Sequence, residues 1–418
     1  MKKTSALLIA ALAAIPAVAG AADEPPAQAS SLLDAITDGK LLLYLRPRYE
    51  YVDQANKPEN ANAYTMRTLF GWRTKPFHGL SVTAEGINVS HLGNQEFNDN
   101  PANRTSPYPT VADPDTTSIN QLYVEYLGLP QTDARVGWQS IKLDNLRFLG
   151  NVDFRQVMQV FDAAWVENKS IDKLTIQAGY LWRQRNILNQ QYRMEMPAFN
   201  ARYAWQPGNE VVGYAYLQNQ DYTGQNTGFS DNSNKIFGLR ANGGYPIGER
   251  FKLLYTGEYA KQDSYADGND AIDAHYVHVG AGPQYGDWFV RIDYELLSSN
   301  DGRYGFQTPL ATLHVFQGWA DQFTTTPKQG IQDTYVAAGG KLFGVSLYTE
   351  LHKFESDSGS IDFGHELDIG LTYPMPFLKG LTGKLEYADY TAGDAVPGDA
   401  LANKVDVRKF WATLIYQF

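Results

Sequence analysis

Apolar and polar residues alternate at every second position along most of this chain after about residue 40. In the stretch 63–74, one face collects large apolar side chains: Tyr64, Met66, Phe70 and Trp72. The other face of the same stretch collects polar ones: Thr65, Arg67 and Arg73. A period of two is typical of β-strands whose two faces meet different surroundings. The pattern therefore predicts a protein built of two-faced strands.

The same reading along the whole chain predicts eighteen strands. Their expected ranges are 41–52, 63–74, 80–91, 119–129, 132–142, 157–168, 173–185, 198–206, 210–219, 235–245, 250–262, 274–285, 288–298, 332–342, 344–355, 364–373, 380–391 and 405–418.

The connections between these strands alternate in length. Every second one is short, as at Pro130-Gln131 and Gly286-Asp287. The other set includes the stretches 93–118, 220–234 and 299–331, which are long and rich in Asn, Asp, Gly, Thr and Pro. Short turns at one end and long loops at the other are typical of outer-membrane barrels. We therefore predict an all-β fold: a single transmembrane antiparallel up-and-down β-barrel of about 18 strands, with short periplasmic turns and long extracellular loops.

A secreted β-sandwich is the alternative fold class. It would bury one apolar face of each strand against a second sheet. Eighteen strands with an apolar outer face, and with Tyr and Trp at the strand ends, instead fit lipid and its two interfaces.

The start of the chain has the features of an export signal. Met1-Lys2-Lys3 is positive, residues 7–18 are apolar, and Ala19-Gly20-Ala21 offers small residues for cleavage. We expect residues 1–22 to be a Sec signal peptide, 23–39 a short periplasmic segment and 40–418 the barrel. The expected location is the outer membrane of a Gram-negative cell.

Composition agrees with an exported strand protein. The chain has 418 residues, with 27 Tyr, 37 Gly and no Cys, so disulfide and thiol chemistry are excluded. The net charge of −11 argues against nucleic acid as a partner. Expected partners are outer-membrane lipid and lipopolysaccharide.

The last strand carries a second address signal. Four outward aromatic or aliphatic residues recur at even positions: Phe410, Leu414, Tyr416 and Phe418. This ending resembles the β-signal that the barrel assembly machinery reads, so that machinery is an expected partner.

The sequence offers no catalytic motif. Gly344-Val345-Ser346 lacks the second glycine of a nucleophile elbow, and His365-Glu366 has no second His for a zinc helix. The segment 267–270 lacks the spacing and the bidentate Glu of a calcium loop. We expect no enzyme activity, no cofactor and no metal.

Charged residues on the inward face are the informative ones. Strand parity directs a group of arginines from the first ten strands into the lumen: Arg46, Arg48, Arg67, Arg73, Arg135, Arg183, Arg185, Arg202 and Arg240. Guanidinium groups present planar donors to carboxylates. A ladder of them would pass an anion from site to site.

Carboxylates take over on the inward face of the later strands. They are Glu258, Asp293, Glu295, Glu350, Glu366, Asp368 and Glu386, with Arg291 and Lys384 as exceptions. Sequential strands are neighbours, so we expect a basic wall facing an acidic wall across the pore. Alternatively, these charges pair with one another and fill the lumen.

Three segments resemble the alginate-export porin family. The stretch 137–150, "GWQSIKLDNLRFLG", is followed by Phe154-Arg155-Gln156 and by Phe161-Asp162-Ala163. The other two segments are "FQTPLATLHVFQGWADQF" with "QDTYVAAGGK", and "LTIQAGYLWR". The resemblance implies an eighteen-stranded monomeric barrel whose namesake exports a polyuronate through an arginine-lined pore with inward-folded loops. By this resemblance, Arg147 and Arg155 would lie on a loop that narrows the channel.

The first functional hypothesis is thus a passive channel for anionic saccharide polymers or other anionic solutes. The second keeps the barrel and makes it a small-nutrient uptake porin. The third is a closed structural or adhesive barrel whose lumen is filled by its own salt bridges. Passive flow follows the concentration gradient, so the sequence leaves export and uptake both open.

Overall fold

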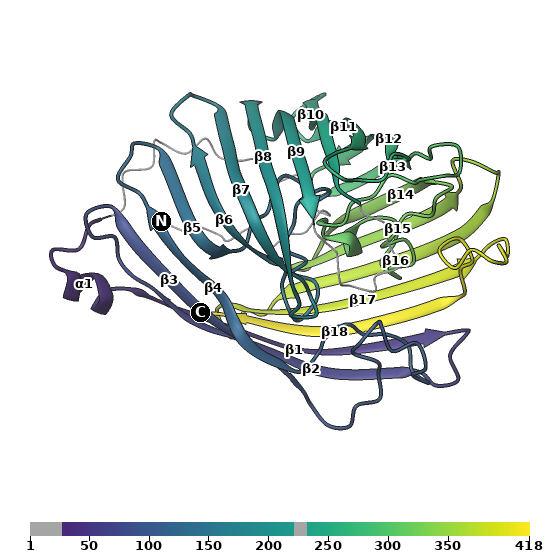
Figure 1. Ribbon diagram of the computed structural model, residues 1–418, viewed down its shortest axis with the longest axis horizontal. Coiled ribbons are helices and arrows are strands. Elements are labelled where there is room, and N and C mark those ends of the chain that lie inside the picture. Colours follow the sequence, from purple (N-terminus) through teal and green to yellow (C-terminus); the bar gives the residue numbers. More distant parts are fainter. Residues whose placement is uncertain (1–26, 221–231) are drawn as a thin grey trace.

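The computed structural model describes residues 27–220 and 232–418, so the predicted signal peptide at 1–22 lies outside the described part. Within these residues, eighteen strands form one antiparallel sheet. The sheet closes on itself because β1 pairs with both β2 and β18 (Figure 1). The predicted all-β, up-and-down barrel is confirmed.

The strands are β1 (Lys40–Gln54), β2 (Ala61–Arg73), β3 (Leu80–His91), β4 (Thr116–Tyr126), β5 (Thr132–Gln139), β6 (Val160–Asn168), β7 (Leu174–Arg185), β8 (Gln191–Gln206), β9 (Asn209–Gln220), β10 (Asn234–Pro246), β11 (Phe251–Ser264), β12 (Asp273–Tyr285), β13 (Trp288–Leu297), β14 (Ile331–Leu342), β15 (Val345–Glu355), β16 (Asp362–Pro374), β17 (Leu381–Ala392) and β18 (Val407–Gln417).

The observed strand bounds differ from the predicted ones by at most three residues, except at the start of β8. That strand begins at Gln191 rather than at 198. Near its start, the apolar Met194 and Met196 are buried, whereas the charged Arg193 and Glu195 are exposed. This order is the reverse of the apolar-out pattern of the other strands. The reversal has a physical reason, since the inward side of this end packs on other protein groups.

The outer face of the barrel is apolar. Exposed side chains include Tyr64 and Phe70 on β2 and Ile292 on β13. At the end of the barrel with the short turns, Trp288 and Phe343 are also exposed, as expected for an interfacial girdle. No helix in the described residues is long and apolar enough to cross a membrane.

A short helix, α1 (Leu32–Thr37), precedes the barrel (Figure 1). The Ser31 side chain caps it by accepting a hydrogen bond from the backbone N–H of Asp34. The indole of Trp72 donates to the Ile36 carbonyl at 2.8 Å, which holds the helix against the end of β2. This end is the one with the short turns.

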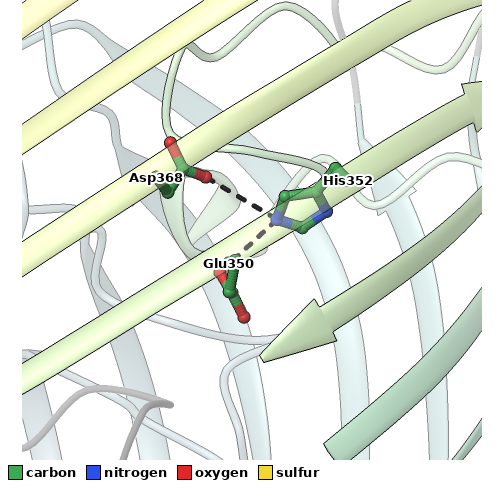
Figure 2. Close-up of side chains that lie close together, drawn as sticks. All are labelled: Glu350, His352 and Asp368. Carbon is green, nitrogen blue, oxygen red and sulfur yellow. Dashed lines mark ion pairs between the residues drawn. The ribbon is translucent and has the colours of Figure 1, made fainter. Parts of the chain in front are cut away.

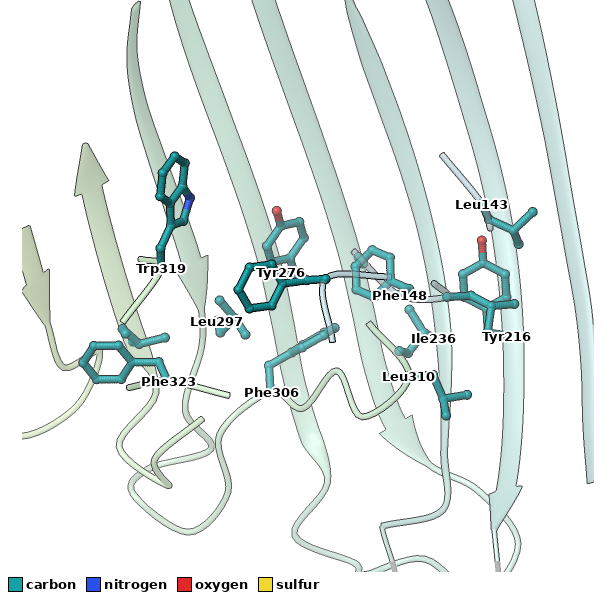
Figure 3. Close-up of a cluster of buried hydrophobic side chains, with 14 of the residues drawn as sticks. Leu143, Phe148, Tyr216, Ile236, Tyr276, Leu297, Phe306, Leu310, Trp319 and Phe323 are labelled. Atoms are coloured by element: carbon teal, nitrogen blue, oxygen red, sulfur yellow. The ribbon is translucent and has the colours of Figure 1, made fainter. Parts of the chain in front are cut away.

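The apolar core lies inside the barrel rather than beneath a second sheet. Figure 3 shows Phe148 and Leu143 beside Tyr216 of β9 and Tyr276 of β12, with Phe306 and Leu310 close by. These side chains come from two loops and from the inward faces of the strands. The loops therefore fill the middle of the lumen.

Candidate functional site

The connection from β5 to β6, residues 140–159, turns into the lumen. Its Phe148 contacts Tyr214 and Tyr276, on strands β9 and β12, with ring centroids 5.2 and 5.5 Å away. Its Phe154 lies edge-on to Trp411 of β18, at 5.7 Å. A loop that reaches from β9 to β18 crosses the channel.

The connection from β13 to β14, residues 298–330, enters from the acidic side and docks on the first loop. The Gly150 N–H donates to the Leu310 carbonyl at 2.9 Å, and the Thr312 N–H donates to the Leu146 carbonyl at 3.0 Å. A Cβ at Gly150 would lie 2.4 Å from the Thr312 hydroxyl oxygen, so only glycine permits this approach. The two loops are therefore joined to each other inside the barrel.

A third loop, residues 92–115, contributes Asp113, whose side chain is buried. One carboxylate oxygen accepts the backbone N–H of Gln156 at 2.7 Å. The other accepts from the Arg48 guanidinium at 2.5 Å. Asp113 thus ties the loop 140–159 to strand β1.

Three predicted inward arginines lie on β1 and β2 and hold the segment 153–156. Arg46 donates to the Asp153 carbonyl at 2.6 Å, and Arg48 donates to the Phe154 carbonyl at 2.6 Å. Arg67 donates to the Asp153 carboxylate at 2.7 Å. Their terminal nitrogens are therefore engaged by the protein's own loops, while Nε of Arg48 and Nε of Arg67 have no hydrogen-bond partner among the described residues.

Arg155 connects the two halves of the lumen. Its guanidinium lies 3.1 Å from the Glu50 carboxylate on β1 and 3.3 Å from Asp321 in the loop 298–330. Asp321 also accepts from Lys409 of β18 at 2.8 Å. Separating the loops would require breaking these charged contacts.

Arg147 lies against the inner wall at β12 and β13 and has fewer hydrogen-bond partners than Arg155. Its side chain is fully buried, and Nη2 lies 3.5 Å from the Glu295 carboxylate. The guanidinium faces the rings of Phe316 and Tyr276, at 4.4 and 5.0 Å from their centroids. None of its three nitrogens has a hydrogen-bond partner among the described residues. This cation therefore has free donors.

Four further predicted inward arginines, Arg73, Arg135, Arg202 and Arg240, pair with carboxylates of the strands. Arg73 and Arg135 share the buried carboxylate of Glu125, which lies 3.0 Å from Nε of Arg135. Arg240 lies 3.0 Å from Glu210, and Arg202 lies 3.9 Å from the same carboxylate. Arg73 and Arg202 keep 40% and 44% of their side chains exposed, so they are open to the lumen entrance.

Arg183 is a correction to the prediction, because it does not lie on the inner face. The pairing of β7 with β8 shifts register between Leu181 and Arg183. Leu181 and Gln184 are buried, whereas the Arg183 side chain is 45% exposed and lies 3.8 Å from Asp162. A bulge adds one residue to the strand, so side chains beyond it point to the opposite face from the one that alternation predicts.

Arg185 is also placed differently from the prediction, since it braces the barrel wall. Strand β5 ends at Gln139 and pairs only with residues 122–126 of β4, so residues 116–121 of β4 have no neighbouring strand on the β5 side. The Arg185 guanidinium reaches across this gap and donates to Ser118 at 3.0 Å and to Asn120 at 2.9 Å. It also donates to the Ile119 carbonyl. These bonds satisfy polar groups of β4 that the inward turn of the chain leaves unpaired.

We expect Arg185→Ala to destabilise the barrel by about 2 kcal/mol, because it leaves buried acceptors of β4 unsatisfied. The heat-modifiability transition on electrophoresis should move to lower temperature. Arg183→Ala is the matched control, because it removes the same charge from an exposed position two residues away. Equal transitions for the two variants would contradict the bracing role.

The inward carboxylates predicted for the later strands are all buried: Glu258, Asp293, Glu295, Glu350, Glu366, Asp368 and Glu386. Several have close partners. Glu258 accepts from the Tyr214 hydroxyl at 2.7 Å, and Asp293 lies between Arg291 and His278, at 2.6 and 2.8 Å. Lys384 donates to Glu386 at 2.5 Å.

Sequence reasoning missed the carboxylates on the basic half. Glu50 and Glu125 share the inward parity of the arginines on their own or adjacent strands, so alternation alone could have found them. Asp113 and Asp153 lie on loops, where no alternation applies. The inward face of the first ten strands is therefore mixed in charge rather than purely basic.

Two loop carboxylates, Asp321 and Asp153, have pKa values below the ordinary value. Burial alone would raise the pKa of Asp321, but the nearby Lys409 ammonium and His314 lower it below its ordinary value. Burial opposes ionisation of Asp153 as well, and Arg67 and Arg46 bring its pKa below the usual range. Both carboxylates therefore remain charged partners for the arginines around them.

A closed barrel with an apolar outer band and a lumen narrowed by inward loops defines a porin-like barrel of the outer membrane. The chain belongs to the alginate-export family, whose model matches residues 45–296. This family and fold are those of channels rather than of enzymes. No curated protein matches the chain.

Solved structures show the same fold at low sequence identity. OpdL of Pseudomonas aeruginosa is 16% identical with a TM-score of 0.68, covering 91% of this chain and 99% of its own. OccAB2 of Acinetobacter baumannii is 14% identical with a TM-score of 0.70, covering 92% and 99%. OpdK of P. aeruginosa, solved with vanillate, is 13% identical with a TM-score of 0.67, covering 92% and 99%.

Proposed function

We propose that this protein is a passive outer-membrane channel for anionic solutes, with an anionic saccharide polymer such as a uronate as the preferred cargo. The single observation that carries the proposal is Arg147. It is a buried guanidinium beside Glu295 of β13, and its nitrogens lack hydrogen-bond partners among the described residues. A carboxylate is the group that its planar donors fit best.

The arginines around the loop 140–159 extend this path. Arg46, Arg48 and Arg67 bind backbone carbonyls and the Asp153 carboxylate of that loop. A carboxylate on a solute has the same chemistry as Asp153. We therefore propose that an anionic cargo takes these contacts over as the loop withdraws, so that no buried guanidinium is left without an acceptor.

A small anionic solute is the second candidate. A polar cavity of about 190 Å³ lies on the side of the short turns, lined in part by Arg135, Lys142 and Glu167. Its size suits a small molecule better than a polymer. The similar OpdK barrel was solved with vanillate, a small organic anion, which is in keeping with this alternative.

The deciding experiment is single-channel recording in planar bilayers under a salt gradient, with and without an added oligouronate. We expect an anion-selective conductance that the oligouronate blocks in a concentration-dependent manner. A control oligosaccharide of equal length without carboxylates should leave the current unchanged.

The other outcomes separate the alternatives. Anion-selective current that is indifferent to the oligouronate but reduced by small carboxylates would favour the small-solute channel. Cation-selective current would contradict both candidates. A silent, correctly folded barrel would favour the closed structural or adhesive barrel held by its own salt bridges.

A further inference from the structure

Three metal-ligating side chains meet on the inner face of the acidic half. Glu350 and His352 are two residues apart on β15, so they share a face. Asp368 of β16 pairs directly with Glu350 across the sheet. Figure 2 shows the Glu350 and Asp368 carboxylates approaching the same imidazole nitrogen of His352. One ligand atom from each residue lies within 4.8 Å of the others.

The imidazole of His352 is held with one nitrogen aimed into this cluster. Its Nδ1 lies 3.0 Å from both carboxylate oxygens of Asp333 on β14. That contact orients the ring, with Nδ1 toward Asp333 and Nε2 toward Glu350 and Asp368. His352 is 4% exposed, and Nε2 has no hydrogen-bond partner among the described residues.

The distances from Nε2 to the two carboxylate oxygens are those expected between two ligands of one metal ion. Nε2 lies 3.5 Å from Glu350 Oε2 and 3.6 Å from Asp368 Oδ2. These distances are long for charge-assisted hydrogen bonds. Ligands about 2.0–2.2 Å from a tetrahedral ion lie about 3.3–3.6 Å from one another. The two separations from Nε2 therefore match those around a metal ion, and all three ligand atoms lie within 4.8 Å of one another.

Both carboxylates are held in place by other groups. The Tyr348 hydroxyl donates to Oε1 of Glu350, which leaves Oε2 turned toward the imidazole. The backbone N–H of Trp319 donates to Oδ2 of Asp368 at 3.1 Å, while Oδ1 of Asp368 has no hydrogen-bond partner among the described residues. A preorganised set of this kind loses little freedom on binding an ion.

We propose that Glu350, His352 and Asp368 form a binding site for a divalent transition-metal ion, with Zn²⁺ as the best fit. One imidazole and two carboxylates match the ligands of zinc, and the Asp333–His352 pair matches the outer-shell carboxylate that orients such ligands. The site lies beneath the loop 298–330, because Trp319 of that loop contacts Asp368. Metal binding would fasten this loop to the acidic wall.

The proposal goes beyond anion transport and does not depend on it. The test is zinc binding to the purified, folded, chelator-treated protein in detergent, measured by competition with a chromophoric zinc indicator. We expect one zinc ion per chain at this site. X-ray absorption at the zinc edge should report one nitrogen and oxygen ligands at about 2.0–2.2 Å.

Four variants make the test specific. His352→Ala and Glu350→Gln should abolish binding. Asp333→Asn, which keeps all three ligands, should weaken it about 10- to 100-fold. His365→Ala is the matched control. This histidine lies on β16, as Asp368 does, but it is exposed, so its substitution should leave zinc binding unchanged.

Absence of zinc binding by the wild-type protein would overturn the proposal. Binding that survives in folded His352→Ala would overturn it as well, since the ion would then lie elsewhere. Heat-modifiability on electrophoresis checks that each variant is folded. If His352→Ala does not fold, unchanged affinity in Glu350→Gln and Asp333→Asn serves as the contradicting result.

Discussion

Replacing residues 144–155 by a short glycine-serine linker is expected to raise the single-channel conductance several-fold and to make the channel more anion-selective. The removed segment carries Phe148 and Phe154, which lie across the lumen, and Arg155, which joins β1 to the loop 298–330. The linker can close the chain because Gln139 and Phe161, which flank the whole β5–β6 connection, are paired residues.

The expected gain in selectivity has a separate cause. The segment carries two arginines, Arg147 and Arg155, and two aspartates, Asp144 and Asp153, so its removal leaves the net charge of the lumen unchanged. It also removes the Asp153 carboxylate and the loop carbonyls that Arg46, Arg48 and Arg67 bind. These guanidinium groups would then face water and permeating ions, and their positive field would favour anions. Current through the widened lumen should therefore become both larger and more anionic.

Bilayer recording with a salt gradient measures both quantities. A matched control replaces Pro58 and Glu59 of the short β1–β2 connection with glycine and serine, which changes only exposed side chains outside the lumen. Its conductance should equal that of the wild type. Unchanged conductance in the folded 144–155 variant would show that this loop is not the constriction.

The strands could be predicted because the two sides of the wall impose a period of two on each strand separately. Lipid outside and water or loops inside select residues such as Phe70 and Arg67 independently of which strands are neighbours. The start of β8 was missed because the buried Met194 and Met196 face inward there, where loops replace water. Alternation in this segment indicates a strand, but it does not say whether the apolar face points to lipid or to the lumen.

The interior could be predicted only in part, because it depends on contacts between distant segments. A single extra residue at the bulge in β7 moved Arg183 out of the lumen, and alternation contains no signal for it. The cluster of Glu350, His352 and Asp368 depends on the register between β15 and β16. Spacing along the chain reveals the first two residues as neighbours but not the third.

The pairing in the lumen also bears on how the channel opens. Arg46, Arg48 and Arg67 of β1 and β2 are each matched by a loop group, so the closed arrangement is stable without any solute. Burying Phe148 and Phe154 contributes about 2 kcal/mol each to the same arrangement. An anionic cargo would compensate the electrostatic part of the cost of opening, whereas a neutral one would not.

Arg147→Gln is expected to lower the affinity for a blocking oligouronate about ten-fold, which corresponds to about 1.4 kcal/mol. A unit charge about 4 Å from an anion contributes about 4 kcal/mol at an effective dielectric constant near 20. Permeating salt and the neighbouring Glu295 carboxylate reduce that value. The anion preference measured from the reversal potential should fall in parallel.

Three further variants show whether the guanidinium itself is responsible. Arg183→Gln removes the same charge from an exposed position and should leave both block and selectivity unchanged. Arg147→Lys keeps the charge but loses the planar donors, so it should retain the selectivity and lose part of the affinity. The double variant Arg147→Gln/Glu295→Gln removes the carboxylate that the single substitution leaves unpaired. If oligouronate block stays at the wild-type level in both the single and the double variant, Arg147 does not bind the cargo, and the anion path must follow the arginines of β1 and β2 alone.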